Sequence, residues 1–200
     1  MATFVLLVVA AGVPPIPISG IGGATLSMPL VGLGTWRMGN DTVTAGTVTE
    51  ALSLGYRHLD CALGYNNQLG VGKGIAGSGI ARDQLWVTSK VPGGLNASAM
   101  EAALEQSVSQ LGLPYVDLML VHYPASWSGV GGPELRKEGW LAMEAWAKKT
   151  GKAKAIGVSH YCKRHLDDVL SVATEPVALN QVQVCPSSGP RCPASHSPHL

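Results

Sequence analysis

The stretch "LWVTSKVPGGLNASAMEAALEQSVSQLGLPYVDLMLVH", residues 85–122, decides the fold. It begins and ends with an apolar run of the kind that forms buried strands, 85–90 and 117–122. Between these runs lies a segment with the periodicity of an amphipathic helix, 99–111. Two strands joined by a helix of this length are expected to pair in parallel through a right-handed crossover.

The helix predicted over 99–111 has an apolar face and a start signal. Leu104, Val108 and Leu111 fall on one side of it. Ser98 and Glu101 have the spacing of a capping box, in which two side chains bond backbone N–H groups reciprocally. We therefore expect the helix to begin next to Ser98.

The same alternation of strands and helices runs through most of the chain. The other strand-like runs are 31–36, 56–60, 155–159 and 178–183, and the other helical patterns are 43–54, 67–76, 134–149 and 161–173. This α/β rhythm is typical of a β/α barrel or of a doubly wound sheet. A Gly-centred hairpin is predicted before it, over 18–30. Six core strands can be counted, whereas a closed (β/α)8 TIM barrel needs eight.

Composition narrows the class of protein. The chain has 200 residues, of which 46% are hydrophobic, so one core and one domain are expected. The chain has fourteen basic and thirteen acidic side chains, and the basic ones form no stripe, which argues against nucleic acid as a partner. No apolar run is long enough to span a bilayer, so no membrane partner is expected.

The two ends differ from the middle of the chain. Residues 1–18 form an apolar leader, for which a secretory signal is one interpretation, although no Lys or Arg precedes the apolar run. Residues 185–200 are rich in Pro and Ser, lack periodicity and are expected to be disordered. The folded domain is therefore expected over 19–184. Cys61 and Cys162 show no disulfide spacing, which favours a cytoplasmic protein.

Four of the predicted strands end in a polar or reactive residue: Asp60, Lys90, His122 and Ser159. In a β/α barrel the C-terminal ends of the strands form one face, and that face holds the active site. Tyr65 lies on the loop just after Asp60 and can lean over the same face. We expect Lys90 to lower the pKa of this phenol, because a nearby cation favours the phenolate. Such a tyrosine is a suitable general acid for a carbonyl oxygen that becomes an alkoxide when it receives hydride.

At these positions the chain resembles the aldo-keto reductases. "GLGTW" (32–36) resembles the first barrel strand of that family, and "GYRHLDCALGYNNQLGVGKGI" (55–75) resembles its signature, with Gln68 where the family usually has Glu. Further matches, in the right order and at the right spacing, are "TSK" (88–90), "LVHYP" (120–124), "KAKAIGVSHY" (152–161) and "NQVQ" (180–183).

The resemblance implies a catalytic tetrad and a cofactor. The tetrad is Asp60, Tyr65, Lys90 and His122, in which Tyr65 donates the proton and His122 orients the substrate. The cofactor is NADPH, more rarely NADH, held without metal by residues that include Gly34, Thr35, Ser159, His160 and Gln181. His160 stands where the family usually has Asn. Trp36 and Tyr123 are implied to line the pocket for a small carbonyl substrate.

The resemblance ends near residue 183, before the ring that stacks on the nicotinamide and the basic loop that grips the 2′-phosphate in this family. We therefore expect a C-terminally truncated or frame-shifted member that lacks two β/α units. The alternative is a catalytically inactive barrel that binds a nucleotide or a partner protein. The sequence leaves substrate and oligomeric state open.

Three other motifs are given structural interpretations. "GKGIAG" (72–77) fits a dinucleotide fingerprint, but it does not directly follow a strand, so the Gly-rich end of a surface helix is preferred. His165 in "HYCKRH" (160–165) is expected to be a solvated surface residue. Four residues near the C-terminus lack the spacing of a zinc finger and are not expected to bind metal: Cys185, Cys192, His196 and His199.

Overall fold

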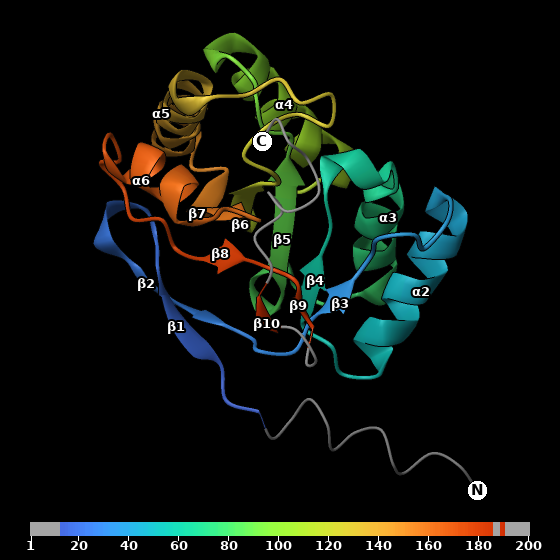
Figure 1. Cartoon of the computed structure of the whole chain (residues 1–200). Helices are drawn as coiled ribbons and strands as arrows, with labels where there is room; N and C mark the ends of the chain where they lie inside the picture. Colours follow the sequence, from blue (N-terminus) through green and yellow to red (C-terminus); the bar gives the residue numbers. More distant parts are fainter. Residues whose placement is uncertain (1–12, 186–188, 191–200) are drawn as a thin grey trace, which may run out of the picture.

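A parallel sheet of six strands, curved into part of a barrel, forms the centre of the molecule. The computed structural model describes residues 13–185 and 189–190. The strand order is β3-β4-β5-β6-β7-β8, and every neighbouring pair is parallel, as predicted (Figure 1). The strands are β3 (Leu33–Gly34), β4 (His58–Asp60), β5 (Trp86–Val91), β6 (Val116–Val121), β7 (Ala153–Ser159) and β8 (Asn180–Gln181).

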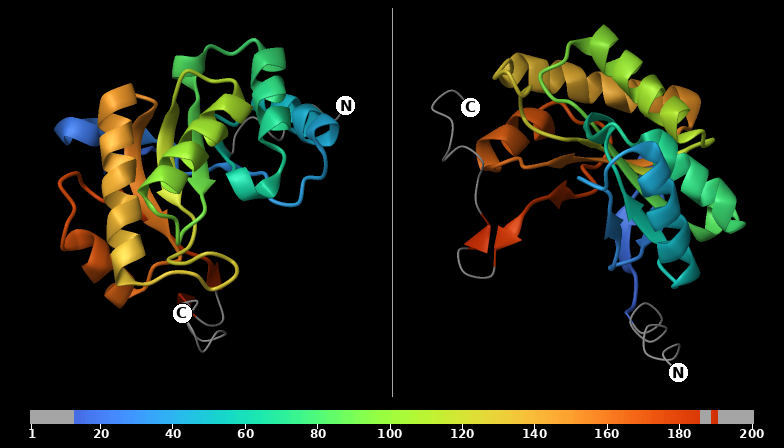
Figure 2. Two further views of the ribbon diagram at one scale, coloured as in Figure 1. Left: turned by 90° about the horizontal axis from the view of Figure 1, so that it is seen from above. Right: turned by 90° about the vertical axis from the view of Figure 1, so that its right-hand side faces the viewer.

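Helices between the strands cover the outer face of this sheet (Figures 1 and 2). They are α2 (Asp41–Ser53), α3 (Gln68–Ser78), α4 (Ala97–Leu111), α5 (Pro133–Thr150) and α6 (Lys163–Leu170), with short 3-10 turns at η2 (Leu63–Tyr65) and η3 (Arg82–Gln84). Strands β5 and β6 are buried along their whole length, because helices pack on one face and barrel interior lies on the other. The main core lies between sheet and helices and includes Val87, Leu104, Met119 and Trp140.

The predicted Gly-centred hairpin is present at the N-terminal ends of the strands. Strands β1 (Ile16–Ser19) and β2 (Thr25–Met28) pair antiparallel around the turn η1 (Ile21–Gly23). Ile18 packs there with Trp86 and Leu118 in a second apolar cluster, which closes the barrel interior at that end. The domain boundary expected at residue 19 falls inside β1.

Three local predictions were wrong. Helix α4 is capped by Asn96, whose Oδ1 accepts from the Ala99 N–H at 2.9 Å, so Ser98 and Glu101 lie inside the helix and form no capping box. His165 is 2% exposed, because the apolar side of the short helix α6 turns it inward against the Tyr161 ring. A two-residue antiparallel pair, β9 (Val184–Cys185) with β10 (Gly189–Pro190), occurs where no strand was expected.

The "GKGIAG" segment lies inside α3, away from any junction between a strand and a helix. Its glycines allow close packing instead. A Cβ on Gly74 would lie 2.7 Å from the Val48 Cβ in α2, and a Cβ on Gly72 would lie 2.1 Å from the Leu111 carbonyl oxygen. The interpretation of this motif as the Gly-rich end of a helix is confirmed.

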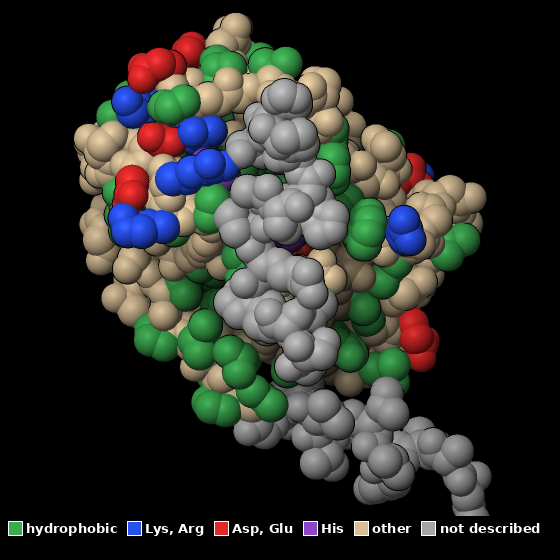
Figure 3. Space-filling model, viewed as in Figure 1, with side chains coloured by type: hydrophobic (Ala, Val, Ile, Leu, Met, Phe, Trp, Pro, Cys, Tyr) green, Lys and Arg blue, Asp and Glu red, His purple; other side chains and the backbone are tan. Residues whose placement is uncertain are grey.

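Charged side chains on the face shown in Figure 3 gather over α5 and α6, where basic and acidic groups alternate. Surface pairs in these helices include Lys137 with Glu134 at 3.1 Å and Lys163 with Asp167 at 2.7 Å. Within the described residues, no helix has the length and apolarity needed to cross a membrane. The expectation that Cys185, Cys192, His196 and His199 bind no metal concerns side chains that lie outside the described residues.

Candidate active site

Asp60 and Lys90 form an ion pair at the C-terminal ends of β4 and β5, in which the ammonium is buried and the carboxylate is partly exposed. The Lys90 ammonium, which is 2% exposed, donates to Asp60 Oδ1 and, at 3.1 Å, to the carbonyl oxygen of Cys61. A buried ammonium needs an anionic partner and further acceptors, and both are provided by consecutive residues of one strand end. The predicted proximity of the two strand ends is therefore observed.

Gln181 holds the other oxygen of this carboxylate. Its Nε2 donates to Asp60 Oδ2 at 2.8 Å, across the mouth from β8 to β4. The Gln181 carbonyl oxygen accepts at 2.9 Å from both the Ser159 hydroxyl and the His160 N–H. Ser159 and Gln181 therefore lie together, as the sequence predicts, but their polar groups bond to protein in this structure.

Tyr65 stands in η2 above the ion pair, half-buried. The Lys90 Nζ lies 5.3 Å from the centroid of the Tyr65 ring, over its face. Burial, followed by the charges of Asp60 and Cys61, raises the pKa of Tyr65 above its ordinary value of 10.0. The predicted lowering is wrong for this state, because Asp60 neutralises Lys90 and the ammonium faces the ring rather than the hydroxyl.

His122 follows the last residue of β6 and meets Tyr65 edge to face, with ring centroids 5.5 Å apart. Its side chain is buried. Burial and the Lys90 charge lower the pKa of His122 to about 4, so the imidazole is neutral at neutral pH. A neutral imidazole offers one N–H donor and one acceptor.

Asp60, Tyr65 and His122 line a cavity of about 530 Å³. Its wall also includes Gln181 and the rings of Trp36 and Tyr123, the two residues that the resemblance assigns to the substrate pocket. Trp127 also lines the cavity and was not predicted; its ring lies 4.6 Å from that of Tyr123, and the residue is 79% exposed. The available signal was a large aromatic residue in the loop that follows the strand ending at His122.

Comparison with known proteins identifies the family. The model described as "Aldo/keto reductase family" matches residues 30–193. The chain belongs to the aldo/keto reductase family. Aldo-keto reductase family 1 member A1 of Cricetulus griseus is 37% identical over 178 residues, which covers 80% of this chain and 54% of that protein. Glyoxal reductase of Bacillus subtilis is 38% identical over 164 residues, 80% of this chain and 56% of that protein.

This aldo/keto reductase chain thus spans about half the length of the curated relatives it matches. Among solved structures, an aldo/keto reductase from Brucella melitensis has a TM-score of 0.72 at 34% identity and covers 83% of this chain and 62% of its own. The Bombyx mori aldo-keto reductase in complex with NADP has a TM-score of 0.73 at 32% identity. The match covers 86% of this chain and 59% of the Bombyx mori chain. The predicted barrel-type fold is confirmed.

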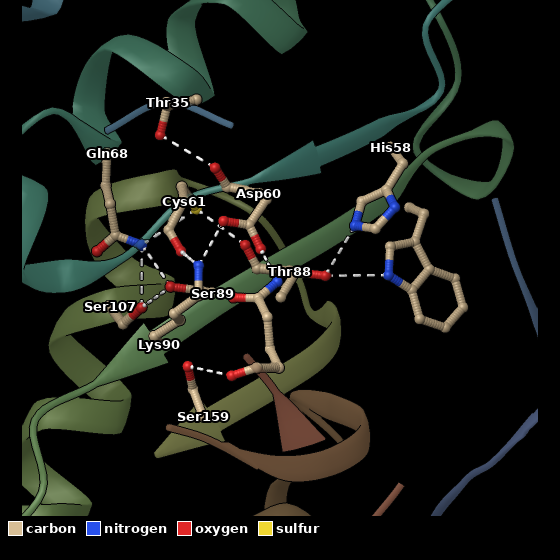
Figure 4. A network of polar contacts seen from close by, with 12 residues as sticks. Thr35, His58, Asp60, Cys61, Gln68, Thr88, Ser89, Lys90, Ser107 and Ser159 are labelled. Carbon is tan, nitrogen blue, oxygen red and sulfur yellow. Dashed lines mark hydrogen bonds and ion pairs between the residues drawn. The ribbon is translucent and has the colours of Figure 1, made fainter. Parts of the chain in front are cut away.

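The aldo/keto reductase site departs from its family pattern at Gln68. Gln68 Nε2 donates to Ser89 Oγ at 2.8 Å and to Ser107 Oγ at 3.0 Å, within a cluster that is fully buried (Figure 4). Through these bonds the start of α3 is tied to β5 and α4. Among the described residues, Asp60 is the only anion paired with Lys90.

His160 is the second residue at which this aldo/keto reductase departs from the family pattern. Its φ of 58° is left-handed, a region in which Asn and His are both enriched, so the backbone required at this position is kept. The imidazole lies parallel to the Tyr123 ring at 4.6 Å. Burial, followed by Lys90, lowers the pKa of His160 below 6.5.

Gly34 and Thr35, at the end of β3, take different places. Gly34 pairs with Asp60 in the sheet, and a Cβ added to it would meet no atom within 4 Å. Thr35 is fully buried and donates through both its N–H and its hydroxyl to the Asp60 carbonyl oxygen, at 2.9 and 3.2 Å. Thr35 therefore supports the backbone of Asp60 rather than facing the cavity.

Proposed function

We propose that the chain catalyses the reversible reduction of a small aldehyde or ketone to an alcohol with NADPH, and that Tyr65 donates the proton. One observation carries this proposal: Tyr65, His122 and Asp60 line one cavity together with aromatic rings, and Lys90 is bonded to Asp60. The nicotinamide of the bound cofactor would supply the hydride.

The protonation states suit these roles. The raised pKa of Tyr65 keeps its proton on the hydroxyl at neutral pH, so the group is a donor when the substrate oxygen develops negative charge. The neutral His122 ring can donate its N–H to the same oxygen and orient it. Lys90, over the Tyr65 ring, would stabilise the phenolate left behind.

Ser159, His160 and Gln181 are proposed to hold the nicotinamide carboxamide. They lie together where β7 and β8 end, and His160 and Gln181 line the cavity. A neutral imidazole and an amide each offer a donor and an acceptor, which is the complement of a carboxamide. The relative from Bombyx mori in complex with NADP supports NADP rather than NAD as the cofactor.

The substrate is proposed to be small and uncharged, since Trp36, Tyr123 and Trp127 supply flat apolar walls and no Lys or Arg side chain of the described residues lines the cavity. The glyoxal reductase of Bacillus subtilis supports a small aldehyde. We place the protein in the cytoplasm, in keeping with the reduced thiol of buried Cys61.

The test is aldehyde-dependent oxidation of NADPH by the purified full chain, followed by absorbance. Binding is measured separately through tryptophan fluorescence, because Trp36 and Trp127 line the cavity. Turnover that depends on both NADPH and aldehyde supports the proposal. Quenching without turnover would replace the proposal by the alternative of an inactive nucleotide-binding barrel. If neither turnover nor quenching is observed, both the enzyme and this alternative are ruled out.

A further inference from the structure

A second cavity shares a loop with the candidate active site. In the loop that joins β6 to α5, Tyr123 and Trp127 line the active-site cavity, whereas Pro124 and Gly131 line a separate cavity of about 290 Å³. The remaining wall of this second cavity comes from the first turns of α5 and α6. One loop therefore contributes to the walls of both cavities.

The titratable side chains that line the second cavity are all of basic type. They are Arg136 from α5, and Arg164 and His165 from α6, and no Asp or Glu of the described residues belongs to the wall. The side chain of Arg136 is only 10% exposed. A guanidinium that is largely removed from water attracts an anion more strongly than one in bulk solvent, because the local dielectric constant is lower.

Both guanidinium groups are held in place by neighbouring side chains. Arg136 lies against Asp168, with its Nε 2.8 Å and its Nη2 2.7 Å from Oδ2, while its Nη1 makes only a long bond of 3.4 Å to the Pro124 carbonyl oxygen. Arg164 Nε donates to His165 Nε2 at 3.2 Å. Arginines that are already ordered lose less conformational entropy when they bind a ligand.

The first turn of α5 adds backbone donors to the same wall. The helix begins at Pro133, and its N-cap residue, Gly132, has no side chain that could accept from the first N–H groups. Both residues line the second cavity. The N–H groups of a first helical turn lack partners within the helix and carry a partial positive charge, so they complement the two arginines.

We propose that the second cavity binds a small phosphate monoester through Arg136, Arg164 and the first turn of α5. A phosphate group has enough terminal oxygens to accept from both guanidinium groups at once, each of which can form two parallel bonds. The volume suits a phosphate with a short substituent and is below the range of sites for larger ligands. The site is separate from the cavity proposed for cofactor and substrate, so this proposal does not depend on the proposed function.

The test is calorimetric titration of the full chain with inorganic phosphate and with glycerol 3-phosphate, at constant ionic strength. Arg164→Gln should weaken the binding of both about tenfold, since one charged donor is lost. Lys163→Gln is the matched control, because it removes the same charge from the same helix at a residue whose side chain is 88% exposed and does not line the cavity. It should bind as the parent does.

Three outcomes of the titration would overturn the proposal. They are no binding of either phosphate by the parent, equal weakening in Arg164→Gln and Lys163→Gln, and equal affinity of the parent for acetate. The second outcome would mean that only the overall charge of the surface matters, and the third that the site does not distinguish a phosphate from a carboxylate. None of them would affect turnover of an aldehyde with NADPH.

A second measurement locates the bound phosphate. The ring-proton signals of His165, His122 and His160 in an NMR spectrum of the parent are each assigned by their loss in the corresponding His→Gln variant. Inorganic phosphate at fixed pH should shift the signal of His165, which lines the second cavity, and leave the other two in place. Shifts confined to His122 and His160 would put the phosphate in the active-site cavity and overturn the proposal.

Discussion

Lys90 reaches Asp60 from a position two residues beyond it in the sheet. The β4–β5 register places Asp60 opposite Thr88. Lys90, two residues after Thr88, lies on the same face of β5, and its long side chain reaches back to the Asp60 carboxylate at the end of β4. Because strand side chains repeat every two residues, a shift by one residue would turn Lys90 into the helix-facing core. The parallel register is therefore what brings the ion pair together.

Removing the cation should leave the partly buried carboxylate of Asp60 without its charged partner. We expect Lys90→Met to lower the free energy of unfolding by about 1–3 kcal/mol, since an acceptor that loses its partner on folding costs free energy. Denaturation in urea measures this. The double variant Lys90→Met/Asp60→Asn should recover part of the loss, because the unpaired carboxylate charge is removed as well. A double variant less stable than Lys90→Met would contradict the assignment.

Removing the hydroxyl of Tyr65 should separate chemistry from binding. Tyr65→Phe keeps the ring against His122 and is expected to reduce turnover of an aldehyde by about 10²- to 10⁴-fold, the usual contribution of a general acid. NADPH affinity, measured by fluorescence, should stay the same. Tyr56→Phe, in the segment before β4, is the matched control and should retain full activity.

Two glycine substitutions of equal size should have opposite effects on stability. A Cβ at Gly74 meets the Val48 Cβ at 2.7 Å and the Ala45 carbonyl oxygen at 2.8 Å, so Gly74→Ala should destabilise by about 1–3 kcal/mol. Gly46, exposed in the middle of α2, has nothing within 4 Å of an added Cβ. Gly46→Ala should stabilise by about 0.5–1 kcal/mol through helix propensity. Thermal unfolding of both variants tests the packing of α3 on α2.

Stability should fall as the solution becomes mildly acidic. Burial first, and nearby cations next, hold the pKa values of His122 and His165 at about 4, against 6.5 in an unfolded chain. Between these values the unfolded state binds more protons, so the free energy of unfolding decreases as pH drops from 6.5 toward 4. Urea denaturation at about pH 7 and pH 5 measures the slope. His165→Gln should make it shallower, and an unchanged slope would show that His165 titrates normally.

The sequence was sufficient for the six core strands, the helices between them and the hairpin, because these follow from periodicity and glycine placement. The convergence of Asp60, Lys90 and His122 also followed, since parallel strands bring their C-terminal ends to one edge. Contacts that depend on side-chain reach did not follow. Nothing in the local sequence indicates that Gln181 bonds Asp60, a residue 121 positions earlier.

Burial of single polar residues was equally hard to predict. His165 lies in a charged hexapeptide and was expected in solvent, yet the packing of α6 on its neighbours places it inside. The direction of the Tyr65 pKa depends on the balance between burial and a cation that Asp60 already compensates, and that balance exists only in three dimensions.

The strands at the two edges of the sheet, β3 and β8, are each two residues long. A strand from another molecule can pair with an edge strand only where the backbone N–H and C=O groups of that edge are unpaired. Very short edge strands are therefore one means by which proteins resist aggregation. The curved sheet, although its two edges do not meet, offers a neighbouring chain almost no length to extend. Concentrated solutions of the folded chain should accordingly resist the growth of intermolecular sheets, and heating should be needed before fibril-binding dyes respond.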